Sequence, residues 1–413
     1  MTINNEHKKL NVPNLRFPEF QGEWEKCRLG EVCTFLSGGT PKIDVKEYWN
    51  GTIPFVSAIS MHDTYILDSK LHISEEGLKH GSRLLTKNNL LLLVRGSMLW
   101  NTIPICLNKN DVAFNQDVKG IIVNDTINNE FLLYWLKSKE QRLKYMVTGT
   151  GLGAGKLDTS DLLSMIVYIP AMKEQDKVAR LLSLFDERIA AQNKIIDKLQ
   201  SLIKGIADNI LDNPLWKKTY LRSFMQFFST NSLSWEQLSY EEGEIRNLHY
   251  GLIHGFFTSG IKSYSLPMVK YGEMPKQYTL CQVGDVAFAD ASEDTDEIGK
   301  SVEFVDTIKG DTICGLHTIH GRDIKNRTVV GFKGFAFNSR YFHNQIKRLA
   351  QGTKVFSITA NNLSSCYVYL PDVETQKVIV KLLKAYEEQL IISRMTLKQY
   401  EKQKQYLLRQ MFI

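Results

Sequence analysis

Two long stretches of the chain carry apolar residues at alternating spacings of three and four. This spacing is typical of a helix that packs one narrow face against a second helix. The first stretch follows Ile169-Pro170 and the second follows Leu370-Pro371. Shifting the first stretch by 201 residues brings it into register with the second. We predict pairing through Val178, Leu181, Phe185, Ile189, Ile196 and Leu199 in the first copy and Ile379, Leu382, Tyr386, Leu390, Leu397 and Tyr400 in the second.

The two stretches also agree at a polar position, because Gln192 of the first corresponds to Ser393 of the second. The clear departure is Ile203, which corresponds to Lys404. A helix of about 35 residues would extend on the order of 50 Å. One such stripe usually packs on its own domain, whereas two stripes in register favour pairing with each other. The pattern is compatible with parallel and with antiparallel pairing.

The segments before the helices predict mixed α/β domains. Short runs of β-branched and aromatic residues, bounded by Gly, Asn, Asp or Pro, are typical of strands. Amphipathic spacing predicts further helices at Glu130–Met146 and Phe337–Leu349. The predicted strands include Thr52–Val56, Leu90–Val94, Gly120–Val123, Val286–Ala289, Val302–Val305 and Val329–Phe332.

Fainter matches relate the two globular segments. Trp24 corresponds to Trp216 at an offset of 192, and Gly149-Thr150 corresponds to Gly352-Thr353 at an offset of 203. The drifting offset indicates insertions within a shared fold, and elsewhere the segments scarcely agree. A common frame with different contents suggests one scaffold that carries two specificities. The predicted order is an N-terminal arm (1–17), a first globular domain (18–170), a first helix (171–213), a second globular domain (214–371) and a second helix (372–413).

The composition is that of a globular protein, with 43% of the 413 residues hydrophobic and 23% charged. The formal net charge of +6 permits an anionic partner without requiring one. Six cysteines without a CxxC pair fit reduced thiols better than a disulfide framework. The N-terminus lacks the apolar stretch of a signal peptide, and the longest aliphatic run, Leu90–Val94, is far below the ~20 residues that cross a bilayer. We therefore expect a cytoplasmic protein without a membrane partner.

Several local motifs, taken in order and with the duplicated helices, point to a known family. In the first half they are Leu29–Val32, Ser37–Lys42, Tyr48-Trp49 and Ile53–Val56, and in the second half Gly284–Ser292 and Gly315–His320. No single motif is decisive. Together they make the chain resemble the specificity subunit of type I restriction–modification enzymes over essentially its whole length.

The resemblance implies a concrete function. Each globular half would be a target-recognition domain that reads one part of a bipartite, asymmetric site in double-stranded DNA. The helices would pair antiparallel, relate the halves by a pseudo-twofold axis and fix the gap between the half-sites. They would also dock two modification subunits, which methylate adenine, and through them the restriction/translocase subunits. S-adenosylmethionine, ATP and Mg²⁺ would be bound by these partners and not by this chain.

DNA binding requires cations and amide donors for phosphates, and forked or amide side chains for base edges. Loops rich in glycine and loops at strand ends offer such groups in both halves. Asn115 and Gln116 could read adenine, or they could satisfy backbone groups in a turn. The candidates are Thr40, Lys42, Arg95, Ser97, Asn115, Gln116 and Lys156 in the first half and Ser292, His317, His320, Arg322 and Lys354 in the second.

Apparent catalytic and metal motifs fail on their spacing. Gly151–Lys156 lacks the GxxxxGK[ST] pattern of a phosphate-binding loop. Cys314, His317 and His320 do not share one face of a strand, and no recognisable spacing provides a fourth ligand. The acidic segment Asp290–Glu297 has Thr295 where a calcium loop needs glycine. We also find no methyltransferase or helicase motif, so we expect no catalytic residue and no metal on this chain.

Two other functions remain as alternatives to the specificity subunit. One is a metal-dependent nuclease that uses the acidic segment together with His317 and His320. The other is a coiled-coil adaptor that reads no bases. The nuclease predicts turnover by the isolated chain, and the adaptor predicts that exchanging a globular half changes nothing.

Overall fold

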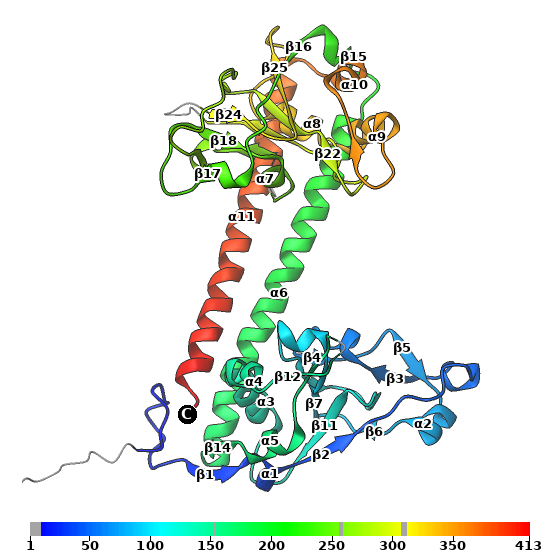
Figure 1. The fold of residues 1–413 in the computed structure, drawn as a ribbon, viewed down its shortest axis with the longest axis vertical. Helices are drawn as coiled ribbons and strands as arrows, with labels where there is room; N and C mark the ends of the chain where they lie inside the picture. Colours follow the sequence, from blue (N-terminus) through cyan, green and yellow to red (C-terminus); the bar gives the residue numbers. More distant parts are fainter. Residues whose placement is uncertain (1–9, 152, 256–258, 307–311) are drawn as a thin grey trace, which may run out of the picture. The chain divides into compact units, whose positions relative to one another are not determined.

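The computed structural model describes residues 10–151, 153–255, 259–306 and 312–413, so most of the predicted N-terminal arm lies outside the described residues. The chain divides into two compact units (Figure 1). Unit 1 comprises the chain up to residue 193 together with 396–413, and unit 2 comprises 194–395. The predicted domain boundaries separate the globular domains from the helices, whereas each compact unit includes half of each long helix. The reason is that each β-rich core packs directly on those helix halves.

The two repeated stretches form the long helices α6 (Met172–Leu211) and α11 (Val373–Gln410). A proline stands just before each of them, where it cannot break the hydrogen-bond ladder, and neither contains one inside. Asp372 caps α11, because its carboxylate accepts hydrogen bonds from the backbone N–H and the hydroxyl of Thr375, both at 2.9 Å. Pro214 follows the end of α6.

Within unit 1 the two helices run antiparallel. Asp186 of α6 pairs with Lys404 of α11, and the guanidinium of Arg188, further along α6, lies over the ring of Tyr400, which precedes Lys404. Residue numbers therefore rise along one helix as they fall along the other. Phe412, just beyond α11, is buried in the core of unit 1. The antiparallel direction implied by the resemblance is confirmed for this part of the pair.

The buried face of each helix departs from the predicted seam in its first turns. Leu382 was predicted to pair but is 39% exposed, while its neighbour Leu383 is fully buried. The same displacement occurs 201 residues earlier, where Leu182 is fully buried and Leu181 only partly. These turns pack on the globular core of their own unit and not only on the other helix, which rotates the buried face by one residue. The prediction for Leu382 is wrong for this reason.

The remaining predicted pairing positions are buried or half-buried. Val178, Ile196, Ile379 and Leu390 are at most 6% exposed. The half-buried positions are Phe185, Ile189, Leu199, Tyr386, Leu397 and Tyr400.

A buried glutamine anchors the start of each long helix. Gln175 is 1% exposed, and its amide donates to the carbonyls of Pro170 and Thr126, both at 2.9 Å. Its Oε1 accepts the backbone N–H of Asn128 at 2.7 Å. Gln376, fully buried, makes the corresponding bonds at an offset of 201, to Pro371, Arg327 and Val329. The duplication thus extends from sequence to individual hydrogen bonds.

Each unit contains a five-stranded sheet of the same topology. The neighbours are antiparallel except for the last pair in each order, which is parallel. In unit 1 the order is β2 (Cys33–Ser37), β11 (Val118–Val123), β7 (Leu90–Leu93), β9 (Ile105–Asn108) and β4 (Tyr65–Ile66). In unit 2 it is β16 (Met225–Phe228), β25 (Thr318–Asp323), β21 (Val286–Ala289), β23 (Ser301–Phe304) and β19 (Gly260–Ile261).

A four-stranded sheet accompanies each five-stranded one, and short sheets complete each unit. The four-stranded orders are β5 (Leu71–Ile73), β3 (Ile53–Val56), β10 (Val112–Phe114), β6 (Leu84–Leu85) in unit 1 and β17 (Leu238–Ser239), β20 (Met268–Val269), β18 (Arg246–Leu248), β24 (Thr312–Cys314) in unit 2. The short ones pair β1 (Glu25–Arg28) with β14 (Ile166–Ile169), β15 (Lys217–Tyr220) with β27 (Tyr367–Leu370), β12 (Thr148–Gly149) with β13 (Gly155–Lys156) and β8 (Arg95–Gly96), and β22 (Ala291–Ser292) with β26 (Phe356–Ser357).

The shorter helices correct two predictions. Val329–Phe332 was predicted as a strand but leads into α8 (Phe332–Ala336), because Gly331 takes a positive φ of 94° and starts a helix there. The predicted helix Glu130–Met146 is divided at Lys139 into α3 (Asn129–Ser138) and α4 (Glu140–Tyr145). The others are α1 (Leu29–Val32), α2 (Glu75–Gly81), α5 (Thr159–Ser164), α7 (Tyr250–Gly255), α9 (Arg340–Leu349) and α10 (Ala360–Ser365).

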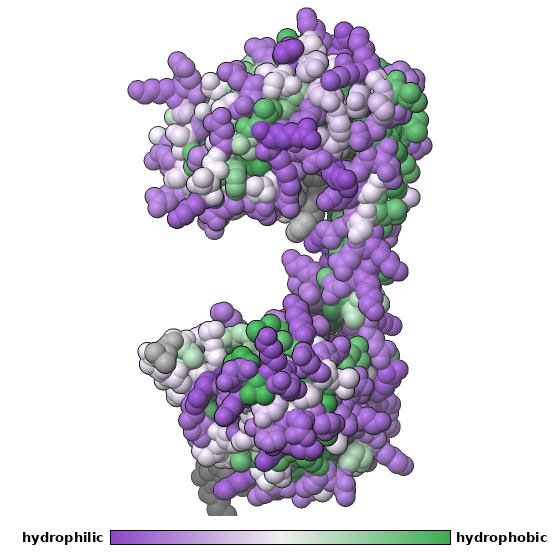
Figure 2. All heavy atoms as spheres, turned by 90° about the vertical axis from the view of Figure 1, so that its right-hand side faces the viewer, coloured by the Kyte–Doolittle hydropathy of each residue, from purple (hydrophilic) through white to green (hydrophobic). Residues whose placement is uncertain are grey.

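Polar side chains dominate the face of the protein that is turned toward the viewer in Figure 2. Figure 2 shows mostly hydrophilic residues on the visible face of each unit, with smaller apolar patches between them. Among the described helices, none combines the length and the apolar character needed to cross a bilayer.

Candidate nucleic-acid interface

In unit 1 the loop after β2 lies against the turn between β10 and β11. Thr40 Oγ1 donates to Gln116 Oε1 at 2.7 Å, and the N–H of Gly39 donates to the carbonyl of Phe114 at 3.0 Å. A Cβ on Gly38 would lie 2.2 Å from that carbonyl oxygen, so only glycine permits the approach. The contact joins two candidates, Thr40 and Gln116, that lie 76 residues apart in the chain. Both are exposed.

The neighbouring candidates differ in how free their side chains are. Asn115 is half-buried and its Oδ1 accepts the backbone N–H of Asp117 at 3.2 Å, so it stabilises the turn. Lys42 is exposed, and no described residue contacts its ammonium group; its carbonyl accepts the indole N–H of Trp49 at 3.1 Å. Gln116 and Lys42 are therefore better placed than Asn115 to meet an external ligand.

A second group of candidates meets on the sheet β12-β13-β8. Arg95 and Lys156 are directly opposite each other in the register of β8 and β13. Arg95 is exposed, whereas Lys156 Nζ lies 3.3 Å from Asp158 Oδ2. Ser97 is exposed at the start of the following 3₁₀ turn, and Trp100, half exposed, donates its indole N–H to a carbonyl of the loop 149–156. Residue 152 of that loop lies outside the described residues.

Unit 2 presents its candidates at the corresponding place in the fold. β22 pairs with β26, which puts Ser292 opposite Phe356 and close in the chain to the exposed Lys354. Gly352 has a φ of 134°, and a Cβ there would lie 1.9 Å from the carbonyl oxygen of Val355. The loop that carries Lys354 therefore depends on glycine.

The two units thus use the same pair of segments with different residues. The first segment follows the central strand, β7 or β21, and the second precedes the short helix α5 or α10. In unit 1 they carry Arg95-Gly96 and Gly155-Lys156, and in unit 2 Ala291-Ser292 and Phe356-Ser357. The fold preserves the position of this surface while its chemistry changes.

The turn between β24 and β25 holds another exposed candidate of unit 2. His317 has a φ of 52°, is half exposed, and its Nδ1 lies 3.1 Å from Asp290 Oδ1. Its ring packs edge-on against Tyr250 at 5.2 Å. His249 stacks between Tyr250 and Trp235 at 4.7 and 4.6 Å. Burial lowers the pKa of His249, and the charge of His317 lowers it further.

The row formed by Trp235, His249, Tyr250 and His317 was missed by the sequence analysis. Trp235 is 44% exposed and ends the row at the surface. Exposed aromatic rings of this kind can make apolar contacts with base edges, such as the thymine methyl group. No local motif marks the row, because its members come from three segments that only the fold brings together.

The prediction that His320 contacts DNA is wrong. Its side chain is 1% exposed, and its Nε2 lies 2.7 Å from Oδ2 of the buried Asp285. Arg322 binds the same carboxylate through Nε and Nη2 at 2.8 and 2.7 Å. Burial raises the pKa of Asp285, but the hydrogen bonds from Arg322 and His320 outweigh it, and the pKa lies below its ordinary value. His320 is too deeply buried to contact DNA. The guanidinium of Arg322 is bound by Asp285 and by the carbonyl of Leu280.

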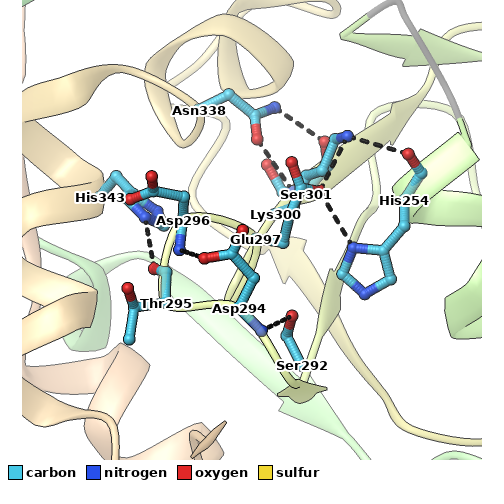
Figure 3. A network of polar contacts seen from close by, with 10 residues as sticks. All are labelled: His254, Ser292, Asp294, Thr295, Asp296, Glu297, Lys300, Ser301, Asn338 and His343. Carbon is cyan, nitrogen blue, oxygen red and sulfur yellow. Dashed lines mark hydrogen bonds and ion pairs between the residues drawn. The ribbon is translucent and has the colours of Figure 1, made fainter. Parts of the chain in front are cut away.

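The acidic segment of unit 2 is a capped turn whose charges are largely paired (Figure 3). Ser292 Oγ accepts the N–H of Asp294, whose carboxylate accepts the N–H of Asp296. Glu297 Oε2 lies 3.1 Å from both His254 Nδ1 and Lys300 Nζ. Lys347 pairs with Asp296. The carboxylates of Asp290, Asp296 and Glu297 are therefore paired within the protein, which does not favour a nuclease centre at this loop.

Among the described residues, one group of His, Cys, Asp and Glu has ligand atoms close enough to share a metal ion, and it consists of Cys281, Cys314 and His320. The spacing considered in the sequence analysis used His317 as the third ligand. In the structure His317 pairs with Asp290, and Cys281 takes its place.

A family model described as "Type I restriction modification DNA specificity domain" matches residues 21–201 and 315–401, which together make up more than half of the chain. The chain belongs to this family. Membership makes DNA sequence recognition within a type I restriction–modification system the function of the chain.

Relatives in this family differ in how much of the chain they match. The specificity subunit of the type I restriction enzyme EcoR124I/EcoR124II of Escherichia coli is 31% identical over 174 residues, 42% of this chain and 43% of its own length. That match spans less than half of either protein. The type I restriction enzyme MjaVIII specificity subunit of Methanocaldococcus jannaschii is 25% identical over 98% of this chain and 95% of its own.

Two solved structures share the fold over nearly the whole chain. The type I restriction–modification system S subunit from M. genitalium has a TM-score of 0.56 at 16% identity, covering 97% of this chain and 99% of that one. A chain from a structure of type I system assembly and conformational transition has a TM-score of 0.55 at 14% identity, covering 93% and 96%. The duplicated α/β architecture with its long helices is thus the fold of the family.

Proposed function

We propose that this specificity subunit reads a bipartite, asymmetric site in double-stranded DNA, with one half-site for each globular domain. Unit 1 would present Thr40, Lys42, Arg95, Ser97 and Gln116 to the DNA. Unit 2 would present Ser292, His317, Lys354 and the aromatic row. Lys156 would contribute to phosphate binding next to Arg95. A protein that binds two unlike half-sites needs two readers of one shape and different chemistry.

The observation that carries this proposal is the change of residues at a shared position. The loop after β2 in unit 1 contacts the following turn through Thr40 and Gln116. The loop after β16 in unit 2 makes the corresponding contact through Asn231, whose Nδ2 donates to the carbonyl of Cys314 at 2.9 Å. Thr40 and Gln116 are exposed in unit 1, so packing of the core does not require their chemistry and it is available to a ligand. Residues that read different bases must differ.

The partners follow from the family and are part of the same proposal. The paired helices would dock two modification subunits that methylate adenine, and through them the restriction/translocase subunits. S-adenosylmethionine, ATP and Mg²⁺ would be bound by those partners, and the isolated chain would have no catalytic activity. Such a complex would work in the cytoplasm, where the DNA is.

The decisive experiment exchanges residues 18–170 for the corresponding domain of another family member and maps methylation by single-molecule sequencing. We expect one half of the methylated motif to change and the other half to stay. The matched control exchanges residues 214–371 and should change the other half. An unchanged motif in both chimaeras would support an adaptor that reads no bases and would refute the proposal.

Binding by the isolated chain supplies a second test. Phosphate contacts release counterions, so the affinity for DNA should fall steeply as salt rises. A flat salt response would contradict extensive phosphate contact. Turnover of DNA by the isolated chain, abolished in Asp290→Ala, would favour the nuclease instead.

A further inference from the structure

Two cysteines and a histidine from separate segments of unit 2 meet in its interior. Cys281 precedes β21, Cys314 ends β24, and His320 lies in β25. The two sulfur atoms are 3.5 Å apart, and both lie within 4.8 Å of a ring nitrogen of His320. The three residues are 9%, 3% and 1% exposed.

The sulfur–sulfur separation of 3.5 Å is close to that within a tetrahedral zinc site, and each sulfur–nitrogen separation is below 4.8 Å. With Zn–S bonds of about 2.3 Å, two sulfur ligands lie about 3.8 Å apart, and with a Zn–N bond of about 2.0 Å a sulfur and a nitrogen lie about 3.5 Å apart. Thiolate and imidazole ligands together favour zinc over magnesium or calcium, which prefer oxygen.

His320 provides an independent indication of a ligand. Its Nε2 is bonded to Asp285, while its Nδ1 is buried and has no hydrogen-bond partner among the described residues. A metal-binding histidine characteristically bonds a carboxylate through one ring nitrogen and the metal through the other. Arg322 holds Asp285 from the opposite direction, so the carboxylate is fixed in place. One ring nitrogen of His320 is thus bonded to a fixed carboxylate, and the other remains without a partner among the described residues.

We propose that Cys281, Cys314 and His320 bind a zinc ion. Two thiolates balance the charge of Zn²⁺ in the protein interior, and their protons leave to solvent when the ion binds. Because the thiols must lose their protons before they bind the ion, zinc affinity should rise with pH.

The ion would stiffen a reading loop of unit 2. Cys314 and His320 lie on either side of the β24–β25 turn, which carries His317. Fixing both ends of the turn would hold His317 and the aromatic row in one conformation. This consequence rests on the proposed function, whereas zinc binding itself does not.

The test measures zinc in the full chain, purified without chelator and with zinc in the medium, by elemental mass spectrometry. We expect one zinc ion per chain, and Cys281→Ser and Cys314→Ser should each lower this value severalfold. Cys106→Ser, which removes a buried thiol of unit 1, is the matched control and should retain full zinc. Replacing zinc with Co²⁺ in the wild-type chain should give the intense visible and thiolate charge-transfer bands of tetrahedral cobalt, a readout that does not depend on any variant folding.

Three results would overturn the proposal. The first is a wild-type chain without zinc and without the cobalt bands. The second is full zinc content in Cys281→Ser. The third is a Cys281–Cys314 disulfide in the chain prepared without reductant, detected as a peptide pair lighter by two hydrogens. Zinc content and methylation specificity are measured separately, so a failure of either proposal leaves the other intact.

Discussion

The two units place chemically opposite residues at one position of their cores. In unit 1 Leu107 of β9 and Leu132 of α3 are buried in an apolar cluster. The sheet register and the offset of 201 assign their places in unit 2 to Glu303 of β23 and Lys333 of α8. These form an ion pair at 3.1 Å with side chains 0% and 2% exposed.

The comparison shows that the scaffold tolerates either solution if its polar groups are satisfied. Glu303 Oε2 also accepts the N–H of Gly334 at 2.9 Å, and Lys333 Nζ donates to Thr328 Oγ1 at 2.8 Å. A buried ion pair contributes little net stability, because removing both charges from water offsets their attraction. It is nevertheless costly to break. This freedom is one reason why the two halves agree so little in sequence while sharing a topology.

The largest predicted effect comes from breaking that pair. Lys333→Leu leaves the carboxylate of Glu303 buried without its partner and should destabilise unit 2 by about 3–5 kcal/mol. The double variant Glu303→Leu/Lys333→Leu copies the residues of unit 1 and should recover most or all of the loss. Hydrogen–deuterium exchange followed by mass spectrometry measures this in unit 2 peptides, with unit 1 peptides as the internal control. A double variant no more stable than the single one would show that the two cores are not interchangeable.

The close approach of loop and turn gives a second contrast. In unit 1 a Cβ on Gly38 would meet the backbone oxygen of Phe114 at 2.2 Å, and backbone cannot easily move. In unit 2 the turn glycine Gly315 faces strand β18 instead, where a Cβ would lie 2.4 Å from the side-chain nitrogen of Asn247 and only a side chain would have to shift. Gly38→Ala should therefore cost about 1–3 kcal/mol and weaken binding of the first half-site, and Gly315→Ala should cost less.

The stability difference between Gly38→Ala and Gly315→Ala can be measured by thermal unfolding. The effect on DNA binding can be measured as the affinity for DNA in which one half-site is altered. Equal losses in the two alanine variants would mean that Asn247 is as rigid as backbone. A larger loss in Gly315→Ala would reverse the contrast.

The smallest effect is a dependence on pH that arises from the buried Glu303–Lys333 pair of unit 2. Burial raises the pKa of Glu303 above its ordinary 4.5, although the charge of Lys333 opposes the shift. Folded protein then keeps the proton to a higher pH than the unfolded chain, so stability falls as pH rises through that window. The slope contributed is at most about 1.4 kcal/mol per pH unit.

Denaturant unfolding at several pH values above 4.5, compared between the wild type and Glu303→Leu/Lys333→Leu, isolates this contribution. The wild type should lose stability relative to the double variant as pH rises. Parallel pH profiles would indicate that Glu303 ionises in the folded state as it does in the unfolded chain.

Local patterns predicted much of the fold because their causes are local. The spacing of apolar residues and the absence of proline define α6 and α11 within a few residues. The run at Leu90–Leu93 is β7, as its aliphatic residues indicate. Val329–Phe332 has strand-like residues but lies before a helix, since Gly331 and the anchor from Gln376 decide the backbone there. The tertiary contact with Gln376 thus outweighs the strand propensity of these residues.

The candidate interface was predictable only in part. Exposed positions such as Thr40, Lys42 and Arg95 were found because loops rich in glycine and loops at strand ends are recognisable in a sequence. The prediction for His320 failed because the order of residues within β25 does not reveal which face of the strand is buried. Cys281 was not connected with Cys314, since the two are 33 residues apart and meet only through a bridge between strands.

The sequence by itself determined the duplication, the two long helices and the family, because periodicity and repeat are properties of residue order. Only the tertiary structure decided which helix residues are buried, which loops meet and which polar groups are hidden. Those outcomes depend on packing between segments far apart in the chain, where the free energy of burying one side chain is set by neighbours that residue order does not identify.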